Sequence, residues 1–258
     1  MISRLLFAFF IFLAAVAGSH AKEWTTVRIG TEGAYPPFNF IDADNQIQGF
    51  DIEIGRALCA EMKVECEFVI QDWDGIIPAL LAHRYDAVMA AMSITGQRKQ
   101  QVAFSDRYHV STASFVARKG STIRDTAPDA MKDLTLGGQS STTYATLLQE
   151  LYAKAGARIR LYATQDEANL DLSKGRLDVV LANKTTLLQW LKNSEEGGCC
   201  TLVGEDINNS AYLGEGVGIA FRKTDPRLRA MFNEALKTIR ENGTYQDIKD
   251  KFFSAEAL

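Results

Sequence analysis

The sequence predicts an α/β protein of two lobes, and two observations lead to this fold class. Apolar runs of strand length alternate with segments of helical periodicity along almost the whole chain, a pattern typical of largely parallel sheets covered by helices. The chain has 258 residues, more than one compact core usually holds, and no low-complexity linker divides it. We therefore expect two lobes joined by crossing strands, with a ligand in the crevice between them.

Each element is expected from its own pattern. The strand-length apolar runs are residues 27–31, 65–70, 86–90, 114–118, 134–138, 158–163, 177–183 and 216–221. The segments of helical periodicity are residues 50–62, 74–84, 95–102, 143–156, 167–175, 185–192, 225–242 and 244–253. The pair Asn242-Gly243 separates the last two, because such a pair ends a helix.

The first residues are expected to be removed on export. Residues 1–21 carry one cation, an apolar run from Leu5 to Val16, and the small residues Ser19 and Ala21 where a cleavage site requires them. This pattern predicts a secretory signal peptide. A membrane anchor is the alternative, but the run is shorter than the roughly 20 residues that a bilayer core needs.

Composition excludes some classes of partner and site. Without residues 1–21, which contain one Arg and no acid, 27 Lys and Arg remain against 32 Asp and Glu, a net charge of −5. No basic patch indicates nucleic acid. The same part of the chain has two histidines, His83 and His109, without metal-ligand spacing, so we expect no metal and no cofactor.

Four cysteines in an exported chain suggest disulfides. Cys59 ends one periodic segment and Cys66 begins the next, a spacing suited to a bridge between a helix end and the neighbouring strand, so we expect a disulfide there. Cys199 and Cys200 are adjacent, and a bridge between neighbours is strained. For this pair, free thiols, a vicinal disulfide and an intermolecular bond all remain open.

Several longer segments resemble one family in order and spacing. They are residues 29–40, 49–62, 72–95, 98–108, 175–183, 218–228 and 242–253, which extend over nearly the whole chain after residue 21. The chain is similar to the periplasmic amino-acid-binding proteins of bacterial ABC importers, the family 3 solute-binding proteins. Within them it is most similar to the branch that binds lysine, arginine, ornithine, histidine or opines. The resemblance implies a type II periplasmic-binding-protein fold, with two hinge strands and a ligand cleft between the lobes.

The resemblance also implies how the chain is divided and what it does. The first lobe would comprise residues 22–108 and 212–258, and the second lobe, with its flanking hinge strands, residues 109–211. The family has a disulfide where Cys59 and Cys66 stand. The protein would be a periplasmic monomer that captures a cationic L-amino acid and delivers it to the membrane permease of an ABC importer.

The segment after the first expected strand would form one wall of the cleft. By resemblance, Tyr35 and Trp73 are two aromatic plates, with Glu32 at the far end of the slot. Aromatic faces attract a cation by ~2 kcal/mol or more when desolvated, and a carboxylate adds charge-assisted hydrogen bonds. The Pro-Pro pair 36–37 would stiffen this wall. Turn composition alone favours Tyr35 and Phe38 as core residues and Glu32 as a solvated residue; with the resemblance, only Phe38 stays in the core.

A second set of residues follows the third expected strand. Arg98 lies five residues beyond Ser93, on the first turns of a helix, and its family counterpart grips the ligand's α-carboxylate, as a planar guanidinium can do bidentately. Ser93, Ala90 and Ala91 would line the slot with a hydroxyl and main-chain groups. The alternative is that Arg98 is a solvated surface residue, and Lys99 beside it is the surface-facing candidate.

The second lobe is expected to contact the same carboxylate. Ser141 and Thr142 lie at the start of an expected helix, where unpaired main-chain N–H groups and the helix dipole favour an anion. They match the family's contacts from that lobe. An N-cap with nothing bound is the alternative, and both can hold.

Asn183 departs from the family pattern. Binders of primary α-amino acids in this branch generally have an Asp at this place, which pairs with the α-ammonium, whereas an amide brings no charge. Asn183 is also similar to the opine-binding members, whose ligands carry a substituted amine on an arginine body. An opine-type arginine conjugate, such as octopine or nopaline, is therefore the second ligand class after a cationic amino acid.

An enzyme is the other class to weigh. A few catalysts resemble this fold, such as cyclohexadienyl dehydratase, in which a carboxyl group in the cleft transfers protons. Two histidines supply no Ser-His-Asp or Cys-His set, and Glu32 already has a binding explanation. Residues 214–218 are rich in glycine but lack the strand-turn-helix context of a dinucleotide loop. We expect a binding protein and not an enzyme.

Overall fold

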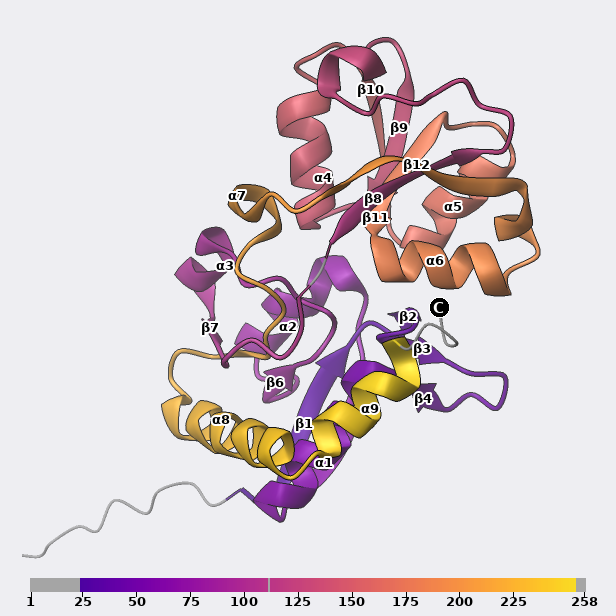
Figure 1. The fold of residues 1–258 in the computed structure, drawn as a ribbon. Coiled ribbons are helices and arrows are strands. Elements are labelled where there is room, and N and C mark those ends of the chain that lie inside the picture. The colour runs from indigo at the N-terminus through magenta and orange to yellow at the C-terminus, as the bar shows by residue number, and fades with distance from the viewer. Residues whose placement is uncertain (1–23, 111, 254–258) are drawn as a thin grey trace, which may run out of the picture.

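The computed structural model describes residues 24–110 and 112–253, which form two units, each built on a five-stranded sheet (Figure 1). The two-lobed α/β fold predicted from the sequence is therefore present. The predicted signal peptide, residues 1–21, lies outside the described residues. Among the helices of residues 24–110 and 112–253, none has the length and apolarity needed to cross a membrane.

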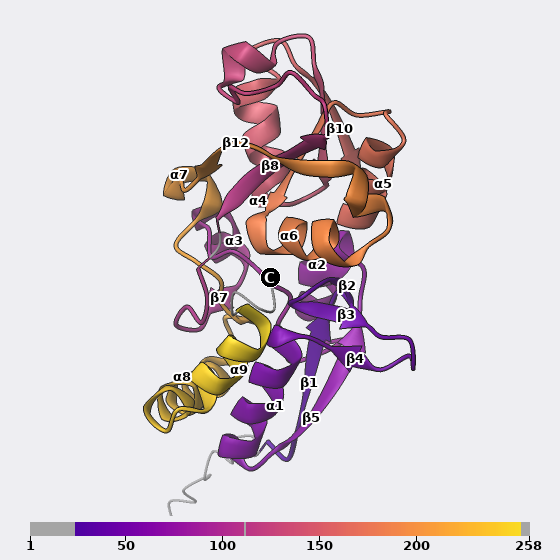
Figure 2. The same ribbon diagram turned by 45° about the vertical axis from the view of Figure 1, so that its right-hand side comes forward.

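The first sheet has the strand order β5-β1-β6-β13-β7. Its strands are β1 (Thr26–Thr31), β5 (Glu65–Ile70), β6 (Ala87–Val88), β7 (Ala103–Phe104) and β13 (Ala220–Phe221). Helices α1 (Phe50–Met62), α8 (Pro226–Glu241) and α9 (Thr244–Phe253) pack together on one face (Figure 2). The other face is covered by η1 (Trp73–Gly75) and α2 (Ile76–Leu81), while α3 (Gly96–Gln101) precedes β7. Three short strands, β2 (Ala34–Tyr35), β3 (Asn39–Ile41) and β4 (Ile47–Gln48), form a separate small sheet.

The second sheet has the strand order β10-β9-β11-β8-β12. Its strands are β8 (Ala113–Arg118), β9 (Thr135–Gln139), β10 (Arg158–Tyr162), β11 (Val179–Asn183) and β12 (Cys200–Ile207). One face packs against α4 (Thr143–Leu147), its π-helical continuation η3 (Leu148–Tyr152) and α7 (Ser210–Leu213); the other packs against α5 (Gln165–Ser173) and α6 (Lys184–Asn193). The short helices η2 (Pro128–Met131) and η4 (Glu196–Cys199) complete this unit.

The chain passes between the sheets twice, from β7 to β8 and from β12 to β13 (Figure 1). The two crossings run together, because His109 forms an antiparallel β-bridge with Val217 and the Thr112 hydroxyl lies 2.8 Å from Asn208 Oδ1. The strands of the first sheet fall within residues 26–104 and 220–221, and those of the second within residues 113–207. This distribution supports the proposed division into residues 22–108, 109–211 and 212–258.

Three features of the sheets differ from expectation. Three neighbouring strands of each sheet are parallel, and the fourth strand, β13 or β8, pairs antiparallel with the strands on both of its sides. Strand β12 was not predicted, since it is an edge strand with many exposed positions and no long apolar run. Of the expected strand 216–221, only Ala220–Phe221 pairs as a named strand.

Gly49 lets the segment around Pro37 and Phe38, the expected wall of the cleft, pack against the start of α1. It has φ of +123°, and a Cβ atom here would lie 2.3 Å from the Phe38 carbonyl oxygen, so a larger residue would clash with the main chain. Beyond Gly49, the Phe50 and Asp51 N–H groups donate to the Pro37 and Phe38 carbonyls at 2.9 and 2.8 Å. The turn that carries the two prolines is thereby held on the helix end.

Both cysteine pairs are bridged. Cys59 at the end of α1 is bonded to Cys66 on β5, with Cα atoms 6.0 Å apart, which confirms the expected disulfide. Cys199 and Cys200 form a vicinal bridge at the start of β12, one of the three arrangements that the sequence left open.

The Cys59–Cys66 bridge is expected to stabilise the first unit by cross-linking the unfolded chain. Replacing both residues by Ala should lower the free energy of unfolding by about 2–3 kcal/mol, as expected for a short loop. Thermal unfolding of the mature protein measures this loss. Mass spectrometry of tryptic peptides, with and without reductant, checks the linkage; free thiols at both positions in exported protein would contradict it.

Candidate functional site

A cavity lies between the two units and is lined from both sides. The first unit contributes a carboxylate, two aromatic rings, small residues and an arginine: Glu32, Tyr35, Trp73, Ala90, Ala91, Ser93 and Arg98. The second unit contributes the end of β9 and the start of α4, with Gln139, Thr142, Thr143 and Tyr144. Most of the residues predicted to form the site are therefore brought together around one cavity.

Glu32 brings a buried carboxylate to this cavity. It follows β1 directly, and its residue is only 7% exposed. Gln139 of the other unit donates from Nε2 to Glu32 Oε1 at 2.5 Å and to the Ala163 carbonyl at 3.1 Å. Burial, together with the weaker effect of the negative charges of Asp166, Asp72 and Asp74, raises the pKa of Glu32 to about 7, although the hydrogen bond from Gln139 lowers it. This part of the site favours a bound cation.

Arg98 brings the opposite charge to the same cavity. Thr95 caps α3 by accepting the Arg98 main-chain N–H at 3.2 Å, which places the arginine in the first turn. Its guanidinium donates to the Ser93 carbonyl at 2.9 Å and to the Ser141 carbonyl at 3.2 Å. Burial lowers the pKa of Arg98 to about 10, so the group keeps its charge at neutral pH. Neither partner is an anion, which leaves this charge available to a carboxylate.

Aromatic rings line the cavity together with these charges. Tyr35 and Trp73 are 7% and 8% exposed, and the Arg98 Cζ atom lies 5.2 Å from the centroid of the Trp73 ring. The Trp73 Nε1 atom is buried and has no hydrogen-bond partner among the described residues. Phe38 is fully buried in the core that packs on α1, as expected, and stacks beside Tyr35 with ring centroids 6.1 Å apart.

The two units are closed on each other in this structure. Besides the Glu32–Gln139 and Arg98–Ser141 contacts, the Ser140 hydroxyl lies 3.0 Å from both carboxylate oxygens of Asp74. All three contacts join the first unit to the end of β9 and the two residues that follow it, Ser140 and Ser141. These residues therefore belong to the face of the second unit that closes on the site.

Two of the predicted site residues lie beside the cavity instead of lining it. Ser141 has φ of +56° and takes part through its carbonyl, which accepts the Arg98 guanidinium. Asn183 is the N-cap of α6: its Oδ1 accepts the Thr185 and Thr186 N–H groups at 2.8 and 3.4 Å. Its main chain lies beside the Tyr35 hydroxyl, whose pKa is raised by burial.

Thr142 lines the cavity and caps α4 at the same time. Its hydroxyl accepts the Ala145 N–H at 3.0 Å and donates to the Gln139 carbonyl at 2.8 Å. Gln139, Thr143 and Tyr144 also line the cavity, and none of them was predicted from the sequence. A polar residue at the last position of an apolar strand, three residues before a capping Thr, is a signal that could have found Gln139.

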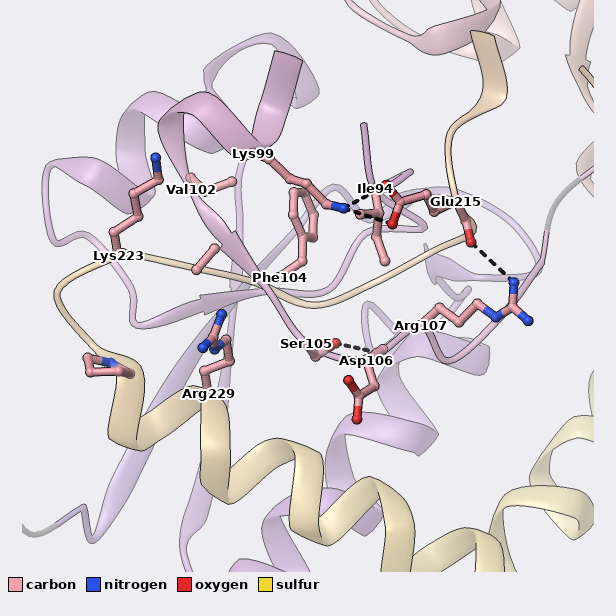
Figure 3. A pocket seen from close by; sticks show the side chains of 12 residues that line it. Ile94, Lys99, Val102, Phe104, Ser105, Asp106, Arg107, Glu215, Lys223 and Arg229 are labelled. Atoms are coloured by element: carbon pink, nitrogen blue, oxygen red, sulfur yellow. Dashed lines mark hydrogen bonds and ion pairs between the residues drawn. The ribbon is translucent and has the colours of Figure 1, made fainter. Parts of the chain in front are cut away.

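A larger and more open groove lies on the first unit alone (Figure 3). Its volume is about 810 Å³, and its charged lining residues are Lys99, Asp106, Arg107, Glu215, Lys223 and Arg229. Lys99 faces this groove, where its Nζ lies 2.6 and 2.7 Å from the two carboxylate oxygens of Glu215. The adjacent Arg98 lines the cavity between the units. The structure thus separates the two neighbouring cations as expected from the sequence.

The fold and the site define a solute-binding protein, and comparison with known families agrees. Residues 27–255 match the family of bacterial extracellular solute-binding proteins, family 3. The chain belongs to this family.

Relatives of known name share most of their length with the chain. It is 43% identical to the L-arginine-binding protein of Pseudomonas aeruginosa over 230 residues, which is 88% of each chain. It is 35% identical to the lysine/arginine/ornithine-binding periplasmic protein of Escherichia coli, covering 97% of this chain and 96% of that one. It is 32% identical to the octopine-binding periplasmic protein of Rhizobium meliloti, covering 95% of each.

Solved structures confirm the type II periplasmic-binding-protein fold. An ancestral arginine-binding protein bound to arginine superposes with a TM-score of 0.82 at 34% identity, covering 89% of this chain and 99% of that one. An ancestral amino-acid-binding protein, a precursor of cyclohexadienyl dehydratase, gives a TM-score of 0.79 at 33% identity, covering 89% and 96%. The second of these proteins binds an amino acid but is a precursor of an enzyme, so the fold is related to catalysis as well as to binding.

Protonation of Glu32 is expected to control closure of the unliganded protein. In the closed form its pKa is about 7, above the ordinary 4.5 that an exposed Glu32 would regain on opening. The closed form thus holds more protons between these values and loses stability relative to the open form as pH rises through about 7. Small-angle scattering should show a larger radius of gyration at pH 8 than at pH 5.

Glu32→Gln is the control for this effect, because an amide does not titrate. The variant should give the same radius of gyration at both pH values. A wild-type protein whose scattering does not change between pH 5 and pH 8 would contradict the assignment.

Proposed function

We propose that this protein captures a cationic L-amino acid between its lobes, with arginine as the first choice, and delivers it to the permease of an ABC importer. One observation carries the proposal: a buried carboxylate, Glu32, and a partly buried guanidinium, Arg98, line the same cavity with two aromatic rings. Opposite charges in one cavity suit a ligand with a carboxylate and a cationic side chain. The names of the relatives support the same ligand class.

Each predicted site residue has a role in this proposal. Arg98 grips the α-carboxylate, and Glu32 meets the side-chain cation between the faces of Tyr35 and Trp73. Smaller polar or main-chain groups complete the contacts around the ligand. These are Ala90, Ala91, Ser93 and Thr142 in the cavity lining, and Ser141 and Asn183 beside it.

The second candidate ligand is an opine-type arginine conjugate. Asn183 carries no charge, and its side-chain oxygen is occupied by the cap of α6, so it offers an α-ammonium no ion pair. A substituted amine needs such a pair less than a primary α-ammonium does. The octopine-binding relative shows that the family includes this ligand class.

Binding without catalysis is the proposed activity. The relatives at 32–43% identity are named as binding proteins. Glu32 is the acid in the cavity, and the ligand cation gives it a binding role. The monomeric state, export through residues 1–21 and a periplasmic location belong to the same proposal.

A thermal-shift screen tests the ligand class. L-Arginine, L-lysine, L-ornithine, L-histidine, octopine and nopaline should be compared with L-glutamine and L-glutamate on the mature protein. Cationic ligands should raise the midpoint of unfolding, since they bind only the folded state. A larger shift with glutamine or glutamate than with every cationic ligand would contradict the proposal.

Glu32→Gln is expected to weaken binding of L-arginine by ~1.5–3 kcal/mol, the value of a hydrogen bond to a charged group. Calorimetry measures the loss. The wild type should also release protons on binding near pH 6.5, because a cation favours the ionised form of a group whose pKa is about 7. Equal affinity in the two proteins would sink the assignment of Glu32.

Arg98→Ala is expected to abolish measurable binding of every ligand in the screen, because each presents a carboxylate that would lose its counter-ion. Arg98→Lys should restore only part of the affinity, since an ammonium cannot form two parallel hydrogen bonds. Lys99→Ala is the matched control and should bind as the wild type, with circular dichroism confirming the fold. Near-native affinity in Arg98→Ala would mean that the carboxylate is held elsewhere.

A further inference from the structure

Asp51 is a buried carboxylate without a counter-ion. It lies in the first turn of α1 and is 0% exposed, and burial raises its pKa to about 6. No lysine, arginine or histidine of the described residues forms an ion pair with it. A buried charge of this kind costs stability unless hydrogen bonds compensate it. Its burial therefore depends on the hydrogen bonds that it accepts.

Three separate segments donate hydrogen bonds to this one carboxylate. The Ala91 main-chain N–H donates to Oδ2 at 2.7 Å, and the Asn39 side-chain amide donates to the same oxygen at 3.0 Å. The Tyr108 hydroxyl donates to Oδ1 at 2.7 Å. Each donor belongs to a different part of the first lobe: the loop after β6, the strand β3, and the segment before the first crossing.

The bond to Ala91 holds a strained part of the cavity lining. Ala91 has φ of +47°, in the left-handed region that is unfavourable for a residue with a Cβ atom. Its N–H is fixed by Asp51, and the residue itself lines the cavity next to Ala90. Without the carboxylate, this peptide would be free to relax to an ordinary conformation.

The hydrogen bond from Asn39 links Asp51 to the segment that carries Glu32. The Asn39 side-chain oxygen accepts the Gly33 N–H at 2.9 Å, and Gly33 has φ of +75°. Glu32 is the residue immediately before Gly33. The amide of Asn39 is thus oriented by Asp51 on one side and orients the Glu32–Gly33 peptide on the other.

The hydrogen bond from Tyr108 links Asp51 to the two chain crossings between the lobes. The Tyr108 N–H donates to the Val217 carbonyl at 2.8 Å, and the Tyr245 hydroxyl donates to the Tyr108 carbonyl at 2.6 Å. His109, the next residue, forms the β-bridge to Val217 that joins the two crossings. Asp51 is therefore linked to the point where the lobes are connected.

We propose that Asp51 is a positioning residue for the ligand site: it holds Ala91, the Glu32 wall and the first crossing in one arrangement before ligand arrives. The inference rests on the proposed function, since it names a residue that prepares the same site without lining it. Because the lobe-1 half is preassembled, little of the ligand's interaction energy is spent on ordering it.

Asp51→Asn tests this role against a matched control. Asp86→Asn is the same substitution at another buried aspartate of the first lobe, 4% exposed, whose partners are Arg28 and Arg222 and which does not contact the site. Calorimetry should show L-arginine affinity at least tenfold weaker than wild type in Asp51→Asn and within about threefold of wild type in Asp86→Asn. This difference is expected even if Asp86→Asn is the less stable of the two variants. Wild-type affinity in Asp51→Asn would overturn the proposal.

The Ala91 amide gives a second readout that does not depend on the ligand. In the unliganded, ¹⁵N-labelled wild type and in Asp86→Asn, its proton should resonate downfield and exchange slowly, as expected for a short bond to a carboxylate. Asp51→Asn should lose both properties, and their persistence there would overturn the proposal. If Asp51→Asn does not fold, Tyr108→Phe removes one donor, and an unchanged arginine affinity in that variant would overturn it equally.

This pair of readouts separates the two proposals. If the wild type binds neither cationic amino acids nor opines, the proposed function fails, while the Ala91 amide still decides whether Asp51 positions the loop.

Discussion

Two side chains of opposite charge line one cavity, and the rest of the site is arranged around them. Glu32 and Arg98 both belong to the first lobe; Glu32 is buried and Arg98 is partly buried. In the closed structure each is met from the second lobe by a neutral group, the amide of Gln139 or the carbonyl of Ser141. Neutral partners compensate a full charge incompletely. A ligand that carries both a carboxylate and a cation would supply what these partners lack.

This arrangement couples binding to closure. The charges lie on one lobe and their closing partners on the other, so a ligand between them contacts both lobes and favours the closed form. The paired crossings, joined by His109 and Val217, connect the lobes at one place. The first lobe is held together near the crossings by the Pro-Pro turn at Gly49 and by the hydrogen bonds of Asp51.

The sequence predicts the first-lobe half of the site better than the second. The resemblance to the family assigned Glu32, Tyr35 and Arg98 to the cleft, whereas turn composition alone favoured Tyr35 as a core residue and Glu32 as a solvated one. Gln139 could not be assigned in this way, because its role depends on closure, which brings it to Glu32 from 107 residues away. The resemblance predicts that Asn183 contacts the ligand. In the structure its side-chain oxygen caps α6 by accepting the Thr185 and Thr186 N–H groups, a role that was not predicted from the sequence. Strand β12 was missed because its exposed edge positions carry no apolar pattern.

Recognition by two opposite charges is tested most directly with three ligands of similar shape. L-Arginine has both charges, L-citrulline replaces the guanidinium by a neutral group, and agmatine lacks the carboxylate. Calorimetry on the wild-type mature protein should show binding of arginine, with citrulline and agmatine each weaker by tenfold or more, about 1.4 kcal/mol or more. Citrulline or agmatine binding as tightly as arginine would contradict this mode of recognition, because one of the two charges would then have no part in it.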